Sequence, residues 1–84
     1  MKIYLECHEE SSGNTRTIKQ FILDHKIYLI DECIAGGVDI QGETKGFQNF
    51  VCMIGKRRFF IYCEEKYCDG KLNQKYFVIK GEKR

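Results

Sequence analysis

The sequence predicts a single α+β domain, in which a short N-terminal helix packs on a mainly antiparallel sheet that ends in a three-stranded meander. A small all-β barrel is the alternative fold. Three observations predict this class: apolar and polar residues alternate in several segments, one segment has helical spacing, and two glycine-containing dipeptides separate the last strands. Because the 84 residues contain no linker-like tract, we expect one compact domain over residues 1–84.

The chain begins with a predicted strand that is followed by a predicted helix. Apolar and polar side chains alternate over Ile3–Cys7, as they do in a half-buried strand. After the polar break ESSGN, helical spacing of the apolar residues predicts a helix over 15–25, on the basis of Ile18, Phe21 and Ile22. The β-branched and aromatic content of this segment makes a strand the alternative.

A hairpin is predicted next. The apolar runs at 27–30 and 38–40 are expected to form its two strands, with the glycine pair 36–37 at the turn. The alternative is a helix that continues through Cys33 and stops at the first of these glycines.

The C-terminal half of the chain predicts a three-stranded antiparallel meander over 47–81. Gly55-Lys56 suits a type II′ turn, because glycine comes first, and Asp69-Gly70 suits a type I′ turn. The first turn pairs Ile54 with Arg57, Cys52 with Phe59, Val51 with Phe60 and Phe50 with Ile61. The second turn pairs Ile61 with Val78, Phe60 with Ile79, Tyr62 with Phe77 and Glu64 with Lys75, and the last pair is charge-complementary.

Both faces of the predicted meander are apolar, whereas an antiparallel sheet usually exposes one polar face. One face holds Phe50, Cys52, Ile54, Phe59, Ile61, Cys63, Tyr76 and Val78, and the other holds Phe47, Val51, Met53, Phe60, Tyr62, Phe77 and Ile79. Burial of the second face is worth several kcal/mol, at about 25 cal/mol per Å² of apolar surface. We therefore expect either that the N-terminal strands curl over this face or that a second chain covers it.

Composition narrows the classes of function. The net charge of +2 is too small to indicate nucleic-acid binding by bulk electrostatics. Five cysteines, an odd number, and the absence of a signal-like N-terminal segment predict a reduced, cytoplasmic protein, and no apolar run is long enough to span a membrane. The cysteines and histidines lack the paired spacing of zinc sites, and no pair of residues has the spacing of a catalytic site. We predict no metal, no cofactor and no enzymatic activity.

The sequence therefore predicts a binding protein that acts through another macromolecule, most directly a protein, with a homodimer through the sheet as a further expectation. Small motif-free proteins of this character are common among phage-encoded inhibitors of host defence systems, including anti-CRISPR proteins. The alternative is a protein that binds single-stranded nucleic acid with its turn cations and sheet aromatics. The predicted partner-binding residues are Met53, Lys56, Arg57, Arg58, Phe60, Tyr62 and Phe77.

Overall fold

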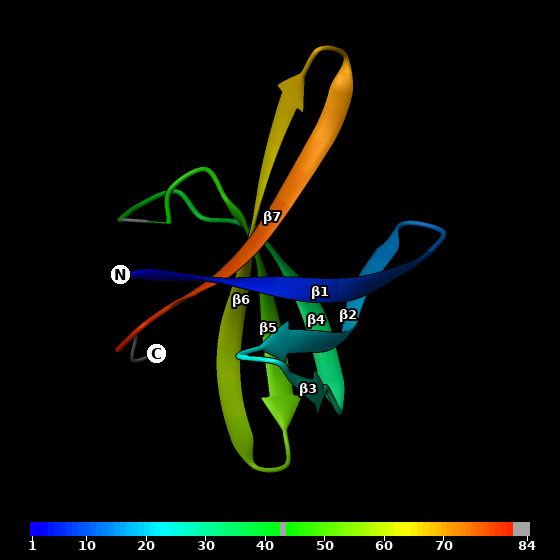
Figure 1. Ribbon diagram of the computed structural model, residues 1–84, viewed down its shortest axis with the longest axis vertical. Coiled ribbons are helices and arrows are strands. Elements are labelled where there is room, and N and C mark those ends of the chain that lie inside the picture. The colour runs from blue at the N-terminus through cyan, green and yellow to red at the C-terminus, as the bar shows by residue number, and fades with distance from the viewer. Residues whose placement is uncertain (43, 82–84) are drawn as a thin grey trace.

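The computed structural model describes residues 1–42 and 44–81, which form one curled antiparallel sheet of seven strands (Figure 1). The strands are β1 (Lys2–Ser12), β2 (Thr15–Leu23), β3 (Lys26–Leu29), β4 (Glu32–Val38), β5 (Gln48–Ile54), β6 (Arg57–Cys68) and β7 (Lys71–Ile79). Their order across the sheet is β3-β2-β1-β7-β6-β5-β4. The described ranges contain no helix, so the α+β prediction is wrong and the all-β alternative matches, as a barrel that is only half closed.

The predicted helix over 15–25 is strand β2, and a β-bulge explains the misleading spacing. Ile18 pairs with Glu9 of β1 and Gln20 pairs with His8, so Lys19 is an extra residue without a partner in β1. A bulge shifts the alternation of side chains by one position. Ile18 and Phe21, three residues apart, therefore both face the interior and imitate one face of a helix.

The predicted hairpin around the glycine pair 36–37 is also wrong, as is its helical alternative. β3 pairs with β2 across the turn Asp24-His25, in which both residues have positive φ (50° and 64°). β4 pairs with β5, and the register shifts between Ala35 and Gly37. A Cβ atom on Gly36 would lie 2.0 Å from Asn49 Oδ1, so any larger residue at this bulge would displace the Asn49 side chain.

The C-terminal meander is confirmed, and so is most of its register. β5 and β6 pair as predicted, from Ile54↔Arg57 to Phe50↔Ile61. β6 and β7 pair as predicted from Tyr62↔Phe77 to Cys68↔Lys71, a range that includes the pair Glu64↔Lys75. The predicted pairs Ile61–Val78 and Phe60–Ile79 do not form, because the two strands separate beyond Tyr62↔Phe77.

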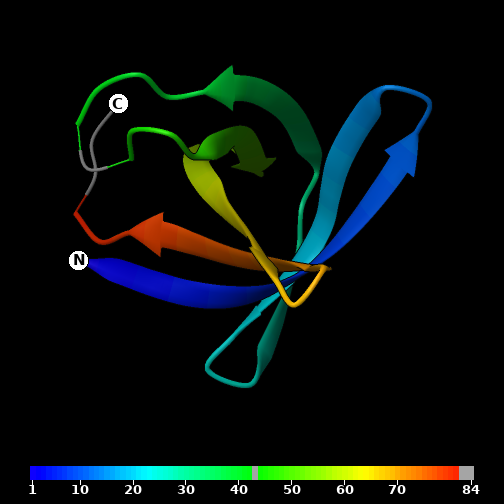
Figure 2. The same ribbon diagram turned by 90° about the horizontal axis from the view of Figure 1, so that it is seen from above.

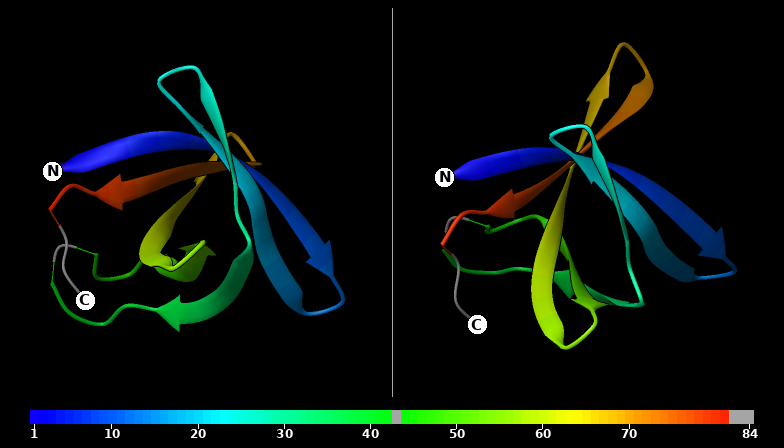
Figure 3. Two further views of the ribbon diagram at one scale, coloured as in Figure 1. Left: turned by 90° about the horizontal axis from the view of Figure 1, so that it is seen from below. Right: turned by 60° about the horizontal axis from the view of Figure 1, so that its bottom comes forward.

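The sheet curls around an apolar interior, with β4 brought round towards β2 (Figures 2 and 3). β4 meets β2 at a seam, where Ile18 N–H of β2 donates to Cys33 Sγ of β4 (3.4 Å) and Ile30 N–H, between β3 and β4, donates to Lys19 O (2.9 Å). The core inside the curl consists of Leu5, Ile18, Phe21, Phe50, Cys52, Ile61, Cys63 and Tyr76. The half-barrel thus has one interior, which is built by every strand except the short β3 and the mostly exposed β4.

The outer face of the meander has a second, smaller apolar cluster that the chain covers by itself. Tyr62 and Phe77 are fully buried there and stack at 5.4 Å. Phe47 contacts Phe77 edge-on at 5.3 Å, and the Lys2 ammonium lies 4.7 Å from the centre of each of these two rings. Stacking and cation–π contacts of this kind stabilise aromatic clusters beyond their burial.

The β4–β5 loop brings Phe47 over the outer face. Two side chains hold it: Thr44 Oγ1 donates to Asp39 Oδ2 (2.5 Å), and Asn49 Nδ2 donates to Asp39 Oδ1. Thr44 and Asn49 are buried, so this polar cluster is paired within the chain. A loop of the same chain, together with the start of β1, thus covers the part of the second face around Tyr62 and Phe77.

Candidate functional site

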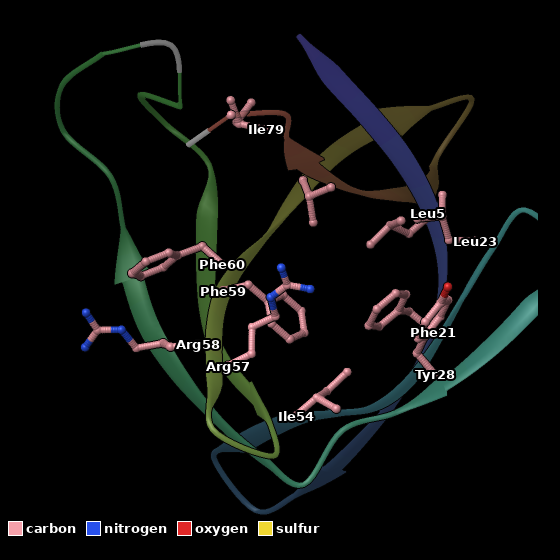
Figure 4. Close-up of a pocket in the computed structure, with 12 residues that line it drawn as sticks. Leu5, Phe21, Leu23, Tyr28, Ile54, Arg57, Arg58, Phe59, Phe60 and Ile79 are labelled. Carbon is pink, nitrogen blue, oxygen red and sulfur yellow. The ribbon is translucent and has the colours of Figure 1, made fainter. Parts of the chain in front are cut away.

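The candidate site is an open cleft of about 810 Å³ at one end of the interior (Figure 4). It lies where β6 and β7 separate, between the β5–β6 hairpin on one side and β1, β2 and β3 on the other. Its lining is mostly apolar and consists of Leu5, Phe21, Leu23, Tyr28, Ile54, Arg57, Arg58, Phe59, Phe60, Val78, Ile79 and Gly81. Both its volume and its apolar character are typical of ligand-binding sites.

A change of partner in β7 creates the cleft. The middle of β7 pairs with β6 on one side and β1 on the other, as shown by Phe77, which faces both Tyr62 and Tyr4. Beyond Phe77, β7 follows β1 alone, with Val78 opposite Ile3. The first half of β6 follows β5 instead. The two strands leave a gap between them, and the side chains that face this gap line the cleft.

Aromatic rings form the wall of the cleft on the β2–β3 side. Phe21 of β2 stacks on Tyr28 of β3, with ring centroids 4.9 Å apart and an interplanar angle of 13°. The Phe21 ring also contacts Phe59 of β6 edge-on at 5.7 Å, across the interior. These rings fix one another in place, so this wall presents a flat and ordered apolar surface.

Arg57 supplies a positive charge over this apolar surface. Its guanidinium group lies over the middle of the cleft, whereas the side chains of Arg58 and Phe60 point away from it (Figure 4). No carboxylate lines the cleft among residues 1–42 and 44–81, and within the same ranges the Arg57 side chain has no ion pair. A cation next to apolar walls interacts more strongly with an anion than it does in bulk water.

The seven predicted partner-binding residues are divided among three environments. Arg57, Arg58 and Phe60 border the cleft, Met53 and Lys56 lie on the same hairpin outside it, and Tyr62 and Phe77 are fully buried under the β4–β5 loop. A partner therefore reaches five of the seven without moving the loop. Their role in binding stays a prediction.

Sequence reasoning missed the opposite wall of the cleft, which comes from β2 and β3. The sequence pattern places Phe21 and Leu23 in a helix and Tyr28 in a hairpin, neither of which the chain forms. One signal was present: Asp24-His25 separates two runs rich in β-branched and aromatic residues by two positions, and aspartate is common in type I′ turns. A β2–β3 hairpin would have placed Phe21 and Tyr28 side by side.

The other end of the interior is closed by polar side chains. Arg16 donates from Nε to Glu9 Oε1 (2.5 Å) and from Nη1 to Glu65 Oε1 (3.2 Å), and the Tyr76 hydroxyl donates to Glu9 Oε2. Burial raises the pKa of Glu9, but the hydrogen bonds from Arg16 and Tyr76 outweigh it and lower that pKa below its usual range. The hydrogen bond to Glu9 raises the pKa of Arg16. Glu9, Arg16 and Tyr76 all have partners within the chain, so these side chains close this end of the interior and stabilise the fold.

The five cysteines are all free thiols, and four of them face the interior or its seam. Burial raises the pKa of Cys7 to about 12 and also raises that of Cys63. Over residues 1–42 and 44–81, no group of three or more His, Cys, Asp or Glu side chains is placed to hold a metal ion. In the same part of the chain, no helix is long and apolar enough to cross a membrane.

Comparisons with protein-family models, with curated proteins and with solved structures gave no match.

Proposed function

We propose that this chain is a non-enzymatic binding protein whose cleft takes an apolar side chain and a neighbouring carboxylate from an extended segment of a protein partner. The observation that carries this proposal is the open apolar cleft with the Arg57 guanidinium over its middle (Figure 4). An apolar side chain would pack on the Phe21–Tyr28 wall, and the carboxylate would pair with Arg57.

The chemistry of the lining supports binding rather than catalysis. Among the described lining residues, the only ionisable groups are the two arginines and Tyr28. Acid–base and nucleophilic catalysis mostly use histidine, carboxylate, cysteine, serine or lysine side chains, none of which lines the cleft among the described residues, and Tyr28 is the one lining group of a type that serves less often. The five free thiols support a location in the reducing cytoplasm.

The strand order supports an extended segment as the ligand. β3 is an edge of the sheet and borders the cleft through Tyr28. A segment that adds to a sheet edge gains backbone hydrogen bonds and directs alternate side chains to one face. Such a segment would gain affinity from the backbone of β3 and specificity from the cleft.

A peptide display library tests the proposal without knowledge of the natural partner. The full chain, Arg57→Gln and Arg58→Gln are immobilised in parallel, and the enriched peptides are sequenced. We expect an apolar residue next to Asp or Glu in the peptides selected by the full chain and by Arg58→Gln. On Arg57→Gln the acidic preference should disappear, because only Arg57 points into the cleft (Figure 4).

The same acidic preference on Arg57→Gln would contradict the proposal, as would peptides that carry no apolar residue. Light scattering on the free chain tests the homodimer. A dimer that dissociates on peptide binding would make a second copy the occupant of the cleft.

The nucleic-acid alternative has less support. The turn keeps three consecutive exposed cations, Lys56, Arg57 and Arg58, but the rings of Tyr62 and Phe77 are fully buried and not open to stacking bases. Binding of a fluorescent single-stranded oligonucleotide at low salt, lost in the triple alanine variant of these cations, would favour it. The inhibitor and anti-CRISPR role stays a prediction.

A further inference from the structure

Two cysteines face each other across strands β4 and β5. Cys33 is the direct partner of Cys52 in the register, and their Sγ atoms lie 3.7 Å apart. Opposite residues of antiparallel strands have Cα atoms about 4.5–5.5 Å apart, which lies within the range that disulfides span. A bond of about 2.05 Å requires the two sulfur atoms to approach by about 1.7 Å, which side-chain rotation can supply.

The two thiols differ in their surroundings. Cys52 is fully buried, whereas Cys33 is half-buried and lines a surface hollow of about 390 Å³ at the seam between β2 and β4. The Cys52 thiol donates to Cys33 Sγ, and Ile18 N–H donates to the same atom at 3.4 Å. These two hydrogen bonds lower the pKa of Cys33, against the effect of burial, while donation and burial raise the pKa of Cys52.

This asymmetry is that of a reactive thiol beside a resolving thiol. Cys33 is reachable from solvent and is stabilised as the thiolate, which is the form that reacts with peroxides. Cys52 stays protonated in the interior at contact distance. Cys7 and Cys63 are less suited to react first, since burial raises the pKa of each of these thiols.

We propose that Cys33 and Cys52 form a thiol–disulfide switch that a hydroperoxide oxidises. The Cys33 thiolate attacks one peroxide oxygen, the O–O bond breaks, and Cys33 becomes a sulfenic acid while the other oxygen leaves and takes up a proton. The Cys52 sulfur then attacks Cys33 Sγ, the S–O bond breaks, and water leaves with the Cys52 proton. In sum, two thiols and one hydroperoxide give one disulfide, one alcohol (water in the case of hydrogen peroxide) and one water.

Oxidation changes the seam as well as the pair. We expect the movement of Cys33 Sγ towards Cys52 to weaken its 3.4 Å hydrogen bond from Ile18 N–H. The other hydrogen bond described near this point joins Lys19 O to Ile30 N–H, which lies between β3 and β4 rather than within β4. The switch therefore loosens the contact between β2 and β4 while it links β4 covalently to β5.

The test uses the full chain and the variant Cys68→Ser, which removes the exposed thiol at the end of β6. Each is treated with one equivalent of hydrogen peroxide, alkylated, and analysed by intact mass and by peptide mapping without reduction. We expect a mass lower by two hydrogen atoms, two thiols lost to alkylation, and one cross-linked peptide joining Cys33 to Cys52. A reducing agent should reverse all three changes.

Cysteine variants and amide hydrogen exchange distinguish this switch from other oxidation reactions of the thiols. Cys33→Ser should abolish the cross-link, and Cys7→Ala should retain it in a protein with an unchanged circular dichroism spectrum. Exchange of the Ile18 amide should accelerate several-fold on oxidation. A disulfide between any other pair, or sulfinic acid at Cys33 without a cross-link, would overturn the proposal. An unchanged Ile18 exchange rate in the cross-linked protein would overturn its effect on the seam.

Discussion

The two ends of the half-barrel interior each carry an arginine, and the two arginines have opposite surroundings. At the closed end, Arg16 pairs with Glu9 and Glu65, and its guanidinium carbon lies 5.4 Å from the centre of the Phe50 ring. At the open end, Arg57 lies over apolar and aromatic side chains, with no carboxylate among the described residues of the cleft. One arginine completes the core, and the other leaves its charge available to a ligand.

The difference lies in the neighbouring strands rather than in the arginines. Glu9 reaches Arg16 because β1 and β2 stay paired past their bulge, up to the hairpin turn. The strands around Arg57 diverge, since β7 leaves β6 after Phe77. Paired strands bring a carboxylate to the cation at one end, and separated strands leave a cleft at the other. Function is therefore expected where the sheet opens.

The largest contrast is expected from replacing each arginine with methionine. Arg16→Met leaves the nearly buried Glu9 without its cation and should lower the free energy of unfolding by about 2 kcal/mol. Arg57→Met removes no internal partner among the described residues and should change it by less than about 0.5 kcal/mol. Urea unfolding followed by circular dichroism measures both. An equal decrease in the free energy of unfolding in the two variants would show that Arg57 stabilises the open end as Arg16 stabilises the closed end.

A second contrast comes from acid. The lowered pKa of Glu9 means that the folded state favours its carboxylate form. Its stabilising effect is therefore fully present above the ordinary value of 4.5 and is lost as the pH falls through the lower folded-state value. We expect the urea concentration at the midpoint of unfolding to decrease as the pH is lowered below 4.5. This decrease should be smaller in Glu9→Gln. In Arg57→Met the fall should match that of the full chain, and a reduced fall there would place a titrating carboxylate at the open end.

Removing one hydroxyl at each end gives a smaller contrast. Tyr76→Phe deletes the hydrogen bond to Glu9 and should cost about 1 kcal/mol. Tyr28→Phe keeps the stack on Phe21 and should change stability by less than about 0.5 kcal/mol. Thermal unfolding of the two variants in one buffer makes the comparison. A larger loss for Tyr28→Phe would reverse the assignment of the two ends.

The meander and the cleft differ in how far the sequence predicts them. Two-residue turns fix the register of their own hairpins, which is why Gly55-Lys56 and Asp69-Gly70 sufficed to pair β5 with β6 and β6 with β7. The pairing of β1 with β7 joins the two ends of the chain, and no local signal specifies it. The cleft depends on that long-range pair, so the sequence could supply only its β6 side.

Bulges account for the errors in the N-terminal half. Strand patterns assume strict alternation, and the extra residues Lys19 and Gly36 each shift it by one. At Lys19 the shift imitated a helix, and at Gly36 the glycine pair imitated a turn. For the outer face the sequence leaves two covers open, the N-terminal strands or a second chain, and in the structure Phe47 from the β4–β5 loop and Lys2 at the start of β1 lie against Phe77. A loop that folds back leaves no periodic signal in the sequence.

The smallest expected effect concerns the open end alone. The fluorescent dye anilinonaphthalene sulfonate combines flat aromatic rings with an anionic group, so it should bind the Phe21–Tyr28 wall beside Arg57. Because Arg57 is exposed, loss of its charge in Arg57→Gln should weaken binding only by roughly two- to fivefold. Arg58→Gln is the matched control and should bind as the full chain does, since its side chain points away from the cleft (Figure 4). Near-ultraviolet circular dichroism must match in all three proteins, because this dye also binds loosely packed states.

Equal dye affinity in Arg57→Gln and Arg58→Gln would mean that the Arg57 charge does not act on ligands in the cleft. The contrast between Arg16 and Arg57 would then be one of stability only.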